Sequence, residues 1–399
     1  MLQKVIKILM KNNFLIVLAL TFLIPFLENF FLNPIVYFLD EQVYIKAGLK
    51  YLRGIPPHLF NYEHPPLAKY IIGLFAIKNI QVLLPIIAIT LTVLLIMFMA
   101  YYFLKEYFRA LMLLGIILTD TLIINMLFFN LLDQIALLFS SASLYFILKY
   151  LLQDSKKYPL YIFGILMGLA IASKWSSLYI LVPVIISMSY LRHDFIKRMP
   201  LVILMAFMTY SATFIVDFIK GGILLYIKHN IDMLNYMIWR HALTIPLIIN
   251  GFLTLICKMS FWSYEYHENL TLTIINSTHI NYTLSLVKIH KLLIQVEFWL
   301  GSLAWPLMLY YSLRLFLDSL KYKSPHQLVI SSATLGAAML PILHGNIAWY
   351  YFPFALLAPI AMVKYVSRKW LAAILILNII QLFIIELGLV NPEYTFVIP

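Results

Sequence analysis

A polar, proline-containing segment near the N-terminus holds residues whose types could do chemistry. It begins with the adjacent acids Asp40 and Glu41 and ends with His64 and Lys69, which bracket a His-Pro-Pro-Leu-Ala-Lys sequence. A carboxylate can take a proton from an attacking hydroxyl, and a lysine or a histidine can stabilise a departing phosphate. The segment follows one apolar run and precedes another. We therefore predict that residues 33–79 form a catalytic loop outside the membrane.

Further candidates lie at the junctions of later apolar runs. Asp133 stands at the start of one run, Lys174 and Trp175 lie between two runs, and His344 and Tyr350 lie near a late junction. Ionisable residues at membrane depth are costly, so they are functional candidates by default. The topology derived below puts all of these residues on one side of the membrane. We expect them to converge on one cavity.

Each charged candidate also has a structural interpretation. The Asp40-Glu41 pair could be a solvated helix end, and Asp133 could cap a helix N-terminus. Lys69 could extend from a helix start to the interface, and Lys174 could contact a lipid phosphate without a catalytic role. Carboxylate oxygens from Asp40, Glu41 and Asp133 could hold a divalent metal, but no ligand spacing in the sequence establishes such a site. The requirement for a metal is therefore open.

The composition predicts an all-α polytopic membrane protein. The chain has 399 residues, of which 63% are hydrophobic and 12% charged, and its mean hydropathy is +0.91. Runs of about 17–25 apolar residues, each long enough to cross a bilayer as a helix, recur along it. The net charge of +12 comes from residues at the ends of these runs, so it needs no nucleic-acid partner. The single cysteine, Cys257, is interpreted as an apolar filler.

The apolar runs predict eleven spans with the N-terminus inside. More than half of the 29 Lys and Arg residues then fall in short inside segments, as the positive-inside rule requires. An odd number of spans puts the C-terminus outside. The expected spans are Phe14 to about Phe31, 80–104, 110–130, 134–152, 159–173, 176–191, 199–219, 299–316, 328–343, 348–363 and 371–390.

A second long external loop is expected at 220–298. It contains three N-glycosylation triplets, at Asn269, Asn276 and Asn281, which agree with an external position. The apolar run 242–257 within it is interpreted as an interfacial or re-entrant helix, with a further span as the alternative. The whole chain, 1–399, is expected to be one membrane domain.

Several motifs resemble those of the protein O-mannosyltransferase family. The Asp40-Glu41 pair, Tyr51-x-x-Gly54 and the segment His64–Lys69 are similar to the family's first external loop. Leu131–Asp133 is similar to its second acidic motif, and Gly164–Trp175 resembles its glycine-rich, Lys-Trp segment. The family belongs to the GT-C membrane glycosyltransferases, which use dolichyl- or polyprenyl-phosphate sugars as donors. The resemblance implies a GT-C fold with two long external loops.

The resemblance also implies roles for the candidates. Asp40 would be the general base that activates an acceptor hydroxyl, with Glu41 orienting the acceptor or the sugar. A single displacement at the anomeric carbon would invert its configuration. The residues implied to contact the donor phosphate are His64, Lys69 and Lys174, with shaping of the loop as the other role implied for His64 and Lys69. Those implied to contact the sugar or the acceptor are Asp133, Trp175, His344 and Tyr350.

Two departures from the family pattern leave the donor and the acceptor open. The arginine that often precedes the second acidic motif is absent from Met126–Asn130, and Tyr350 replaces the histidine of the late motif. We expect transfer of a hexose, most plausibly mannose, to protein Ser or Thr at the external face of the membrane. An archaeal-type cell membrane is expected, with the endoplasmic reticulum as the alternative. A lipid or lipid-linked glycan acceptor is the alternative. A transporter or flippase for a lipid-linked substrate is the alternative from a different class.

Overall fold

The computed structural model describes residues 14–104, 106–152, 157–240, 245–266, 272–273, 291–344 and 347–398. The α-helices of its first half are α2 (Phe14–Phe31), α3 (Asp40–Leu52), α4 (Leu67–Ile77), α5 (Leu83–Leu104), α6 (Tyr107–Leu118), α7 (Thr121–Met126), α8 (Leu132–Leu152), α9 (Tyr158–Ser173) and α10 (Ser177–Leu191). Those of its second half are α11 (His193–Ala212), α12 (Ile215–Arg240), α13 (Ile245–Cys257), α14 (Trp305–Lys321), α15 (Pro325–His344), α16 (Phe352–Tyr365) and α17 (Arg368–Glu386). Two short 3-10 helices are η1 (Pro57–Leu59) and η2 (Ala348–Tyr351), and the strands are β1 (Met259–Tyr266), β2 (Leu272–Thr273), β3 (Lys291–Glu297) and β4 (Glu393–Ile398).

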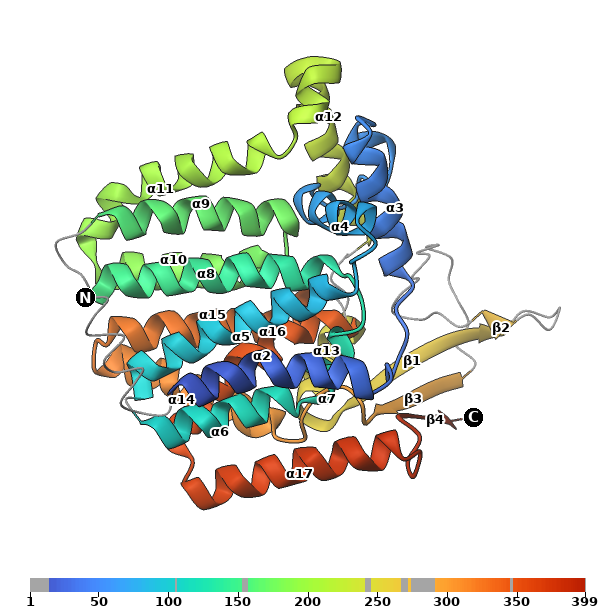
Figure 1. Cartoon of the computed structure of the whole chain (residues 1–399), viewed down its shortest axis with the longest axis vertical. Coiled ribbons are helices and arrows are strands. Elements are labelled where there is room, and N and C mark those ends of the chain that lie inside the picture. The colour runs from blue at the N-terminus through green and yellow to red at the C-terminus, as the bar shows by residue number, and fades with distance from the viewer. Residues whose placement is uncertain are drawn as a thin grey trace.

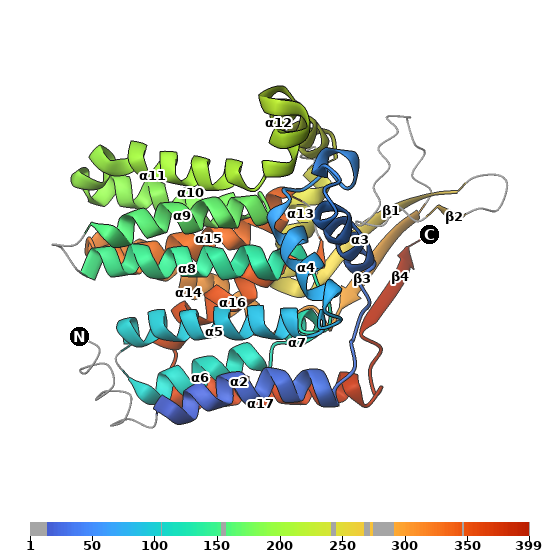
Figure 2. The same cartoon turned by 45° about the horizontal axis from the view of Figure 1, so that its top comes forward.

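Long apolar helices lie side by side in one bundle, and α3, α4, α12 and the strands gather at one end of it (Figures 1 and 2). The C-terminal end of α5, the N-terminal end of α6 and the turn that joins α16 to α17 lie at the other end (Figure 1). By length and composition, five of the described helices could cross a membrane, namely α5, α8, α11, α15 and α17. Shorter apolar helices, including α2, α9 and α10, lie among them. Every expected span overlaps a helix of the structure.

Two expected spans differ from the helices observed. The run 110–130 is divided because Asp120 ends its first part and caps α7, accepting a hydrogen bond from the Leu122 amide at 3.0 Å. The run 199–219 is divided at Ala212, and α12 follows with a kink at Gly222, whose φ of 66° is in the region that favours glycine. The apolar run 242–257 forms α13, which at 13 residues is roughly 20 Å long and shorter than a bilayer core.

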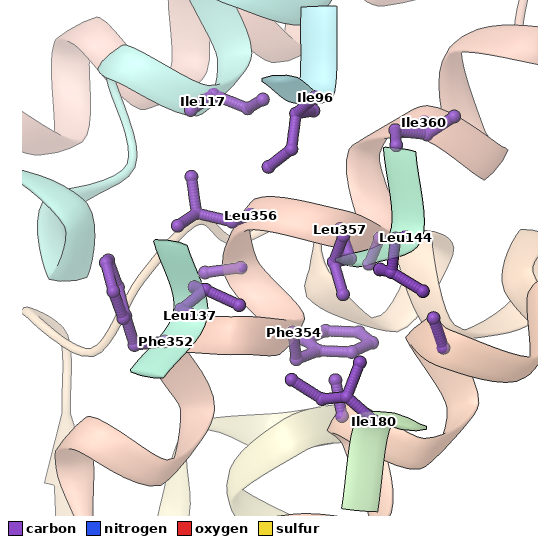
Figure 3. Packing of buried hydrophobic residues seen from close by; sticks show 14 of the residues in the cluster. Ile96, Ile117, Leu137, Leu144, Ile180, Phe352, Phe354, Leu356, Leu357 and Ile360 are labelled. Atoms are coloured by element: carbon purple, nitrogen blue, oxygen red, sulfur yellow. The ribbon is translucent and has the colours of Figure 1, made fainter. Parts of the chain in front are cut away.

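Helix α16 lies at the centre of the packed core. Its residues from Phe352 to Val363 are all buried, so it is apolar on every side. Leu137 on α8 and Ile180 on α10 are among the side chains packed around its Phe354 and Leu357 (Figure 3). Because α16 follows η2 directly, this packing also fixes the position of Tyr350.

The glycines of the Gly164–Trp175 segment serve helix packing. A Cβ at Gly164 would lie 2.8 Å from the Val202 carbonyl oxygen, and one at Gly168 would lie 2.4 Å from that of Ala206. Both carbonyls belong to α11, so the two glycines allow α9 and α11 to approach at backbone distance. This contact holds the C-terminal end of α9, where Lys174 follows.

An antiparallel sheet, which the sequence analysis did not predict, lies beyond the same end of the bundle as α3 (Figure 2). The strand order is β2-β1-β3-β4, with Trp262 opposite Leu293 and Leu293 opposite Val397. Strands β1, β2 and β3 come from the second long loop, and β4 comes from the C-terminal segment. The two segments predicted to be external therefore meet in one sheet.

Candidate active site

Asp133 and Lys174 form a buried ion pair. Asp133 lies in the first turn of α8, and Lys174 follows α9 with an extended backbone that ends the helix. The Lys174 Nζ lies 2.9 Å from Oδ1 and 2.8 Å from Oδ2 of Asp133, and the side chains are 1% and 4% exposed, respectively. Buried charges of this kind are stable only when they are paired. Two residues predicted from separate motifs are thus in direct contact.

Asp40 is the first residue of α3, where the helix N-terminus stabilises negative charge. One turn later, the Tyr44 hydroxyl donates a hydrogen bond to Asp40 Oδ2 over 3.4 Å. Burial, followed by the negative charges of Asp40 and Asp133, raises the pKa of Tyr44 well above its ordinary value. Tyr44 therefore stays a hydrogen-bond donor, while the half-buried Asp40 carboxylate can be reached from outside.

These residues and Tyr350 make up what we call the acid–lysine cluster: Asp40, Tyr44, Asp133, Lys174 and Tyr350. Asp40 interacts electrostatically with Asp133, and Tyr44 interacts with both acids and with Tyr350. The ring centre of Tyr350, a residue that is 3% exposed, lies 4.7 Å from the Lys174 Nζ. The cluster combines a carboxylate that can accept a proton with a cation that can neutralise a departing anion.

Glu41 connects α3 to the segment that precedes α8. Its Oε1 accepts hydrogen bonds from the Asn130 backbone amide at 3.0 Å and from the Asn130 Nδ2 at 2.6 Å. Asn130 comes three residues before Asp133, so this contact sets the distance between the two acidic motifs. The observed position of Glu41 suits the positioning of Asp40 better than direct contact with a substrate.

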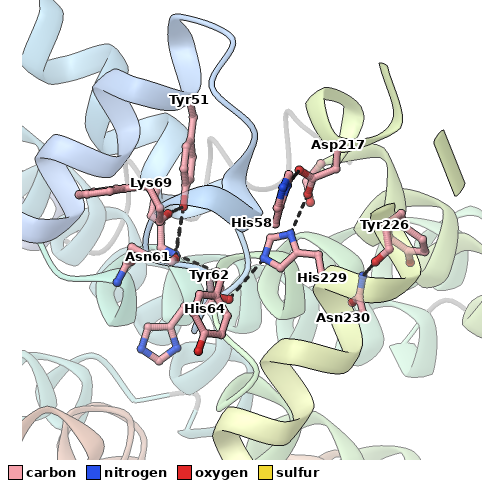
Figure 4. Close-up of polar contacts among 12 residues, drawn as sticks. Tyr51, His58, Asn61, Tyr62, His64, Lys69, Asp217, Tyr226, His229 and Asn230 are labelled. Atoms are coloured by element: carbon pink, nitrogen blue, oxygen red, sulfur yellow. Dashed lines mark hydrogen bonds and ion pairs between the residues drawn. The ribbon is translucent and has the colours of Figure 1, made fainter. Parts of the chain in front are cut away.

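Lys69 is fully buried and supports the loop between α3 and α4 from within. Its Nζ donates to the carbonyl oxygens of Asn61 and His64, the latter at 2.8 Å, and lies 3.5 Å from the Tyr51 hydroxyl (Figure 4). Burial lowers the pKa of Lys69 to about 7. The loop-shaping interpretation of Lys69 fits these contacts. His64 lies nearer the cluster, with its ring centre 6.3 Å from that of Tyr44.

Trp175 points to a different part of the structure from Lys174. Its Nε1 donates a 3.1 Å hydrogen bond to the Tyr210 hydroxyl, which donates to Asn230 Oδ1 at 2.6 Å. Trp175 thereby joins the end of α9 to α11 and α12. His344 ends α15, but its side chain lies outside the described part of the chain. The predicted glycosylation sites, Asn269, Asn276 and Asn281, also lie outside the described residues.

The three carboxylates considered for a metal have separate partners. Both oxygens of Asp133 accept from Lys174, Glu41 Oε1 accepts from Asn130, and Asp40 Oδ2 accepts from Tyr44. Within the described ranges, no group of three or more His, Cys, Asp or Glu side chains is arranged to hold a metal ion. The arrangement does not resemble an oxygen cage for a divalent cation.

Sequence reasoning missed several residues at this end of the bundle. Tyr44 could have been found from its i, i+4 spacing to Asp40, had residues 40–52 been predicted as a helix. Asn130 carried a weaker signal, as the polar residue just before Leu131–Asp133. A further group, His58, Asp217 and His229, had no local signal, because 159 residues separate His58 from Asp217.

A family model for dolichyl-phosphate-mannose-protein mannosyltransferase matches residues 63–216, which include Asp133 and Lys174 but not Asp40. No curated protein sequence matches the chain. The structure is similar to that of ArnT from Cupriavidus metallidurans, solved with undecaprenyl phosphate. The TM-score is 0.58 and the sequence identity is 13%, and the match covers 92% of this chain and 63% of ArnT.

A second similar structure is the archaeal oligosaccharyltransferase AglB from Archaeoglobus fulgidus, solved with an inhibitory peptide and a dolichol-phosphate. Its TM-score is 0.53, with 13% identity over 96% of this chain and 56% of that one. The chain thus spans less than two-thirds of the length of either protein. The likeness confirms the predicted fold class: the chain has the fold of the GT-C membrane glycosyltransferases.

Proposed function

We propose that the chain is a membrane glycosyltransferase that takes a hexose from a dolichyl- or polyprenyl-phosphate carrier. The hexose that we propose is mannose. The acceptor is a Ser or Thr hydroxyl of a protein. The observation that carries this proposal is the acid–lysine cluster, in which the Asp40 carboxylate acts electrostatically on Asp133 of the buried Asp133–Lys174 pair. The match to a mannosyltransferase family model and the lipid phosphates bound to the two similar structures support the choice of donor.

In the proposed reaction, Asp40 accepts the proton of the acceptor hydroxyl as the oxygen attacks the anomeric carbon. The bond from that carbon to the phosphate oxygen breaks, and the lipid phosphate leaves with the electron pair. The configuration at the carbon is inverted. Tyr44 holds one oxygen of Asp40 and leaves the other for the acceptor. An ammonium has three donors, and the pair with Asp133 uses two, which leaves one of Lys174 for the departing phosphate.

A transfer assay tests the proposal. Purified protein in lipid is given labelled dolichyl-phosphate mannose with a Ser/Thr-rich peptide, and separately with lipid and lipid-linked glycan acceptors. We expect label on the peptide and a loss of about 10²–10⁴-fold in the Asp40→Asn variant, the usual contribution of a general base. Asp232→Asn on α12 is the matched control and keeps full activity.

The outcomes separate the alternatives. Label on a lipid acceptor alone would replace the protein acceptor but keep the class of enzyme. No product with any acceptor, together with movement of labelled donor across the vesicle membrane, would favour a transporter. Undiminished transfer by Asp40→Asn would contradict the role assigned to Asp40.

We also propose that the acid–lysine cluster faces the outside, with the N-terminus inside and the C-terminus outside a cell membrane of archaeal type. The basic residues of the inside turns support this orientation, as do the three glycosylation triplets. Mapping of glycosylation with Asn276→Gln and its two counterparts tests it. Absence of glycan from all three sites, together with cleavage of the 220–298 loop by protease from the cytoplasmic side only, would reverse the orientation.

A further inference from the structure

A buried carboxylate lies between two histidines next to the first external loop. Asp217, in the first turn of α12, is 0% exposed. Its Oδ1 lies 3.1 Å from Nδ1 of His58 in η1, and its Oδ2 lies 2.7 Å from Nδ1 of His229 (Figure 4). The kink at Gly222 separates Asp217 from His229 within α12 and lets the two side chains meet. The role of the acid–lysine cluster does not involve this group.

His229 contacts two hydrogen-bond acceptors. Besides Asp217, its ring contacts the carbonyl oxygen of Tyr62, 3.3 Å from Nε2. A carboxylate and a carbonyl can only accept hydrogen bonds, and a neutral imidazole has only one N–H. Both contacts are hydrogen bonds only when both ring nitrogens carry a proton. His229 is fully buried, and the charge of this imidazolium is balanced by Asp217.

The Tyr62 carbonyl belongs to a loop that is held from two sides (Figure 4). Lys69 on α4 binds the carbonyls of Asn61 and His64, and His229 on α12 binds the carbonyl between them. The backbone of Asn61 is in the left-handed region, with a φ of 53°, so the loop relies on these contacts to keep its shape. His64 leaves this loop next to the acid–lysine cluster.

We propose that His58, Asp217 and His229 form a proton-dependent clasp that fixes the first external loop, residues 57–64, to α12. Loss of one proton from His229 leaves a bare ring nitrogen facing an acceptor, so one of its two contacts becomes repulsive and the attachment of the Tyr62 segment to α12 is weakened. His58 and Asp217 are the titratable groups in contact with His229, and the hydroxyls of Tyr51 and Tyr70 interact electrostatically with Asp217. The ring of Phe214 packs edge-on against His229 with 5.2 Å between centres. For the enzyme, the clasp is a positioning device; this consequence rests on the proposed function.

Spin-label distances test the clasp without any substrate. In a Cys257→Ser background, which removes the only native cysteine, Leu59→Cys and Leu234→Cys supply two exposed labelling sites, one on η1 and one on α12. The full chain is reconstituted in lipid, and the distance distribution is measured by pulsed EPR from about pH 5.5 to about pH 9, a range that covers histidine titration. We expect one narrow distance at low pH and loss of that component as the pH rises. The same transition is expected in Lys69→Met, which removes the other contact of this loop that titrates in the range.

The variants give the matching comparison. His229→Gln carries its two donors on one nitrogen, which cannot take the place of both ring nitrogens, so we expect a broad distribution at low pH as well. His326→Gln, at the start of α15, is the control and behaves as wild type. A wild-type distribution that stays narrow across the whole range would overturn the proposal, and this titration needs no clasp variant to fold. Since neither donor nor acceptor is present, failure here is distinct from failure of the transfer assay.

Discussion

The buried pair of Asp133 and Lys174 leads to a sharp prediction about stability. Its two contacts of 2.8 and 2.9 Å lie in a place where the partners are 4% and 1% exposed, so water cannot replace a missing partner. Removing one partner of such a pair leaves an unpaired buried charge and costs about 3–5 kcal/mol. We expect this loss in the free energy of unfolding for Lys174→Met. Asp133→Asn, which strands the ammonium, is destabilised in the same way.

The double variant distinguishes this reasoning from simple loss of packing. With both charges gone, no charge is stranded, so the variant with both substitutions should be more stable than Lys174→Met alone by at least about 1 kcal/mol. Arg314→Gln is the control. The Arg314 Nε lies 4.0 Å from Oδ2 of Asp318, and the two side chains are 51% and 33% exposed, respectively. Exposed pairs of this kind contribute about 0–1 kcal/mol to stability. Reversible unfolding in mixed detergent micelles measures all four. Additive losses in the double variant would refute the argument.

Three further predictions follow from the external loop. Burial lowers the pKa of Lys69 from 10.5 to about 7, so between these pH values the unfolded chain binds more protons than the folded one. The free energy of unfolding should therefore rise with pH over this range. Lys69→Met should lose this rise, which unfolding at several pH values will measure. Gly48→Ala puts a Cβ 2.1 Å from the Lys69 carbonyl oxygen and should lower the free energy of unfolding by about 1–3 kcal/mol. Gly115→Ala is the control. The nearest atom there is a movable leucine methyl at 3.1 Å, so this variant should be tolerated in the same unfolding assay. Glu41→Ala removes two charge-assisted hydrogen bonds from Asn130 and should lower the free energy of unfolding by about 1.5–3 kcal/mol. Glu41→Gln should be intermediate in stability between wild type and Glu41→Ala. Equal stability of the two variants would contradict a stabilising contact between Glu41 and Asn130.

The meeting of Asp133 and Lys174 was within reach of sequence reasoning. Hydropathy located α8 and α9 to within two residues, because a continuous apolar run of bilayer length has few other structures available. Two consecutive spans joined by a short inside turn run antiparallel, so the start of the first and the end of the second must lie at the same face. The residues at those two ends, Asp133 and Lys174, then had to be neighbours.

The helices outside the bundle were beyond such reasoning. Residues 40–52 are not apolar enough for hydropathy to predict a membrane span. Their helix is held by contact with α4, where Gly48 and Gly73 allow the two backbones to approach closely. The sheet likewise depends on strands that meet across the fold, since β3 pairs with β4 about 100 residues further on. Local sequence carries little information on contacts of this range, which is why the Asp217 clasp was also missed.

The division of labour between Asp40 and Glu41 follows from helix geometry that the sequence does not reveal by itself. Adjacent residues on an α-helix point about 100° apart, so two neighbouring acids cannot face the same partner. In α3, Glu41 faces Asn130 and is occupied by two hydrogen bonds, whereas Asp40 faces the side of Tyr44, one turn further along. In an extended loop, adjacent side chains would instead alternate between opposite sides, and either acid could have reached a substrate. Because residue 40 begins a helix, the two acids have different partners: Glu41 is bound to Asn130, whereas Asp40 is held by Tyr44 and acts electrostatically on Asp133. Substitution of Asp40 should therefore reduce transfer more than substitution of Glu41.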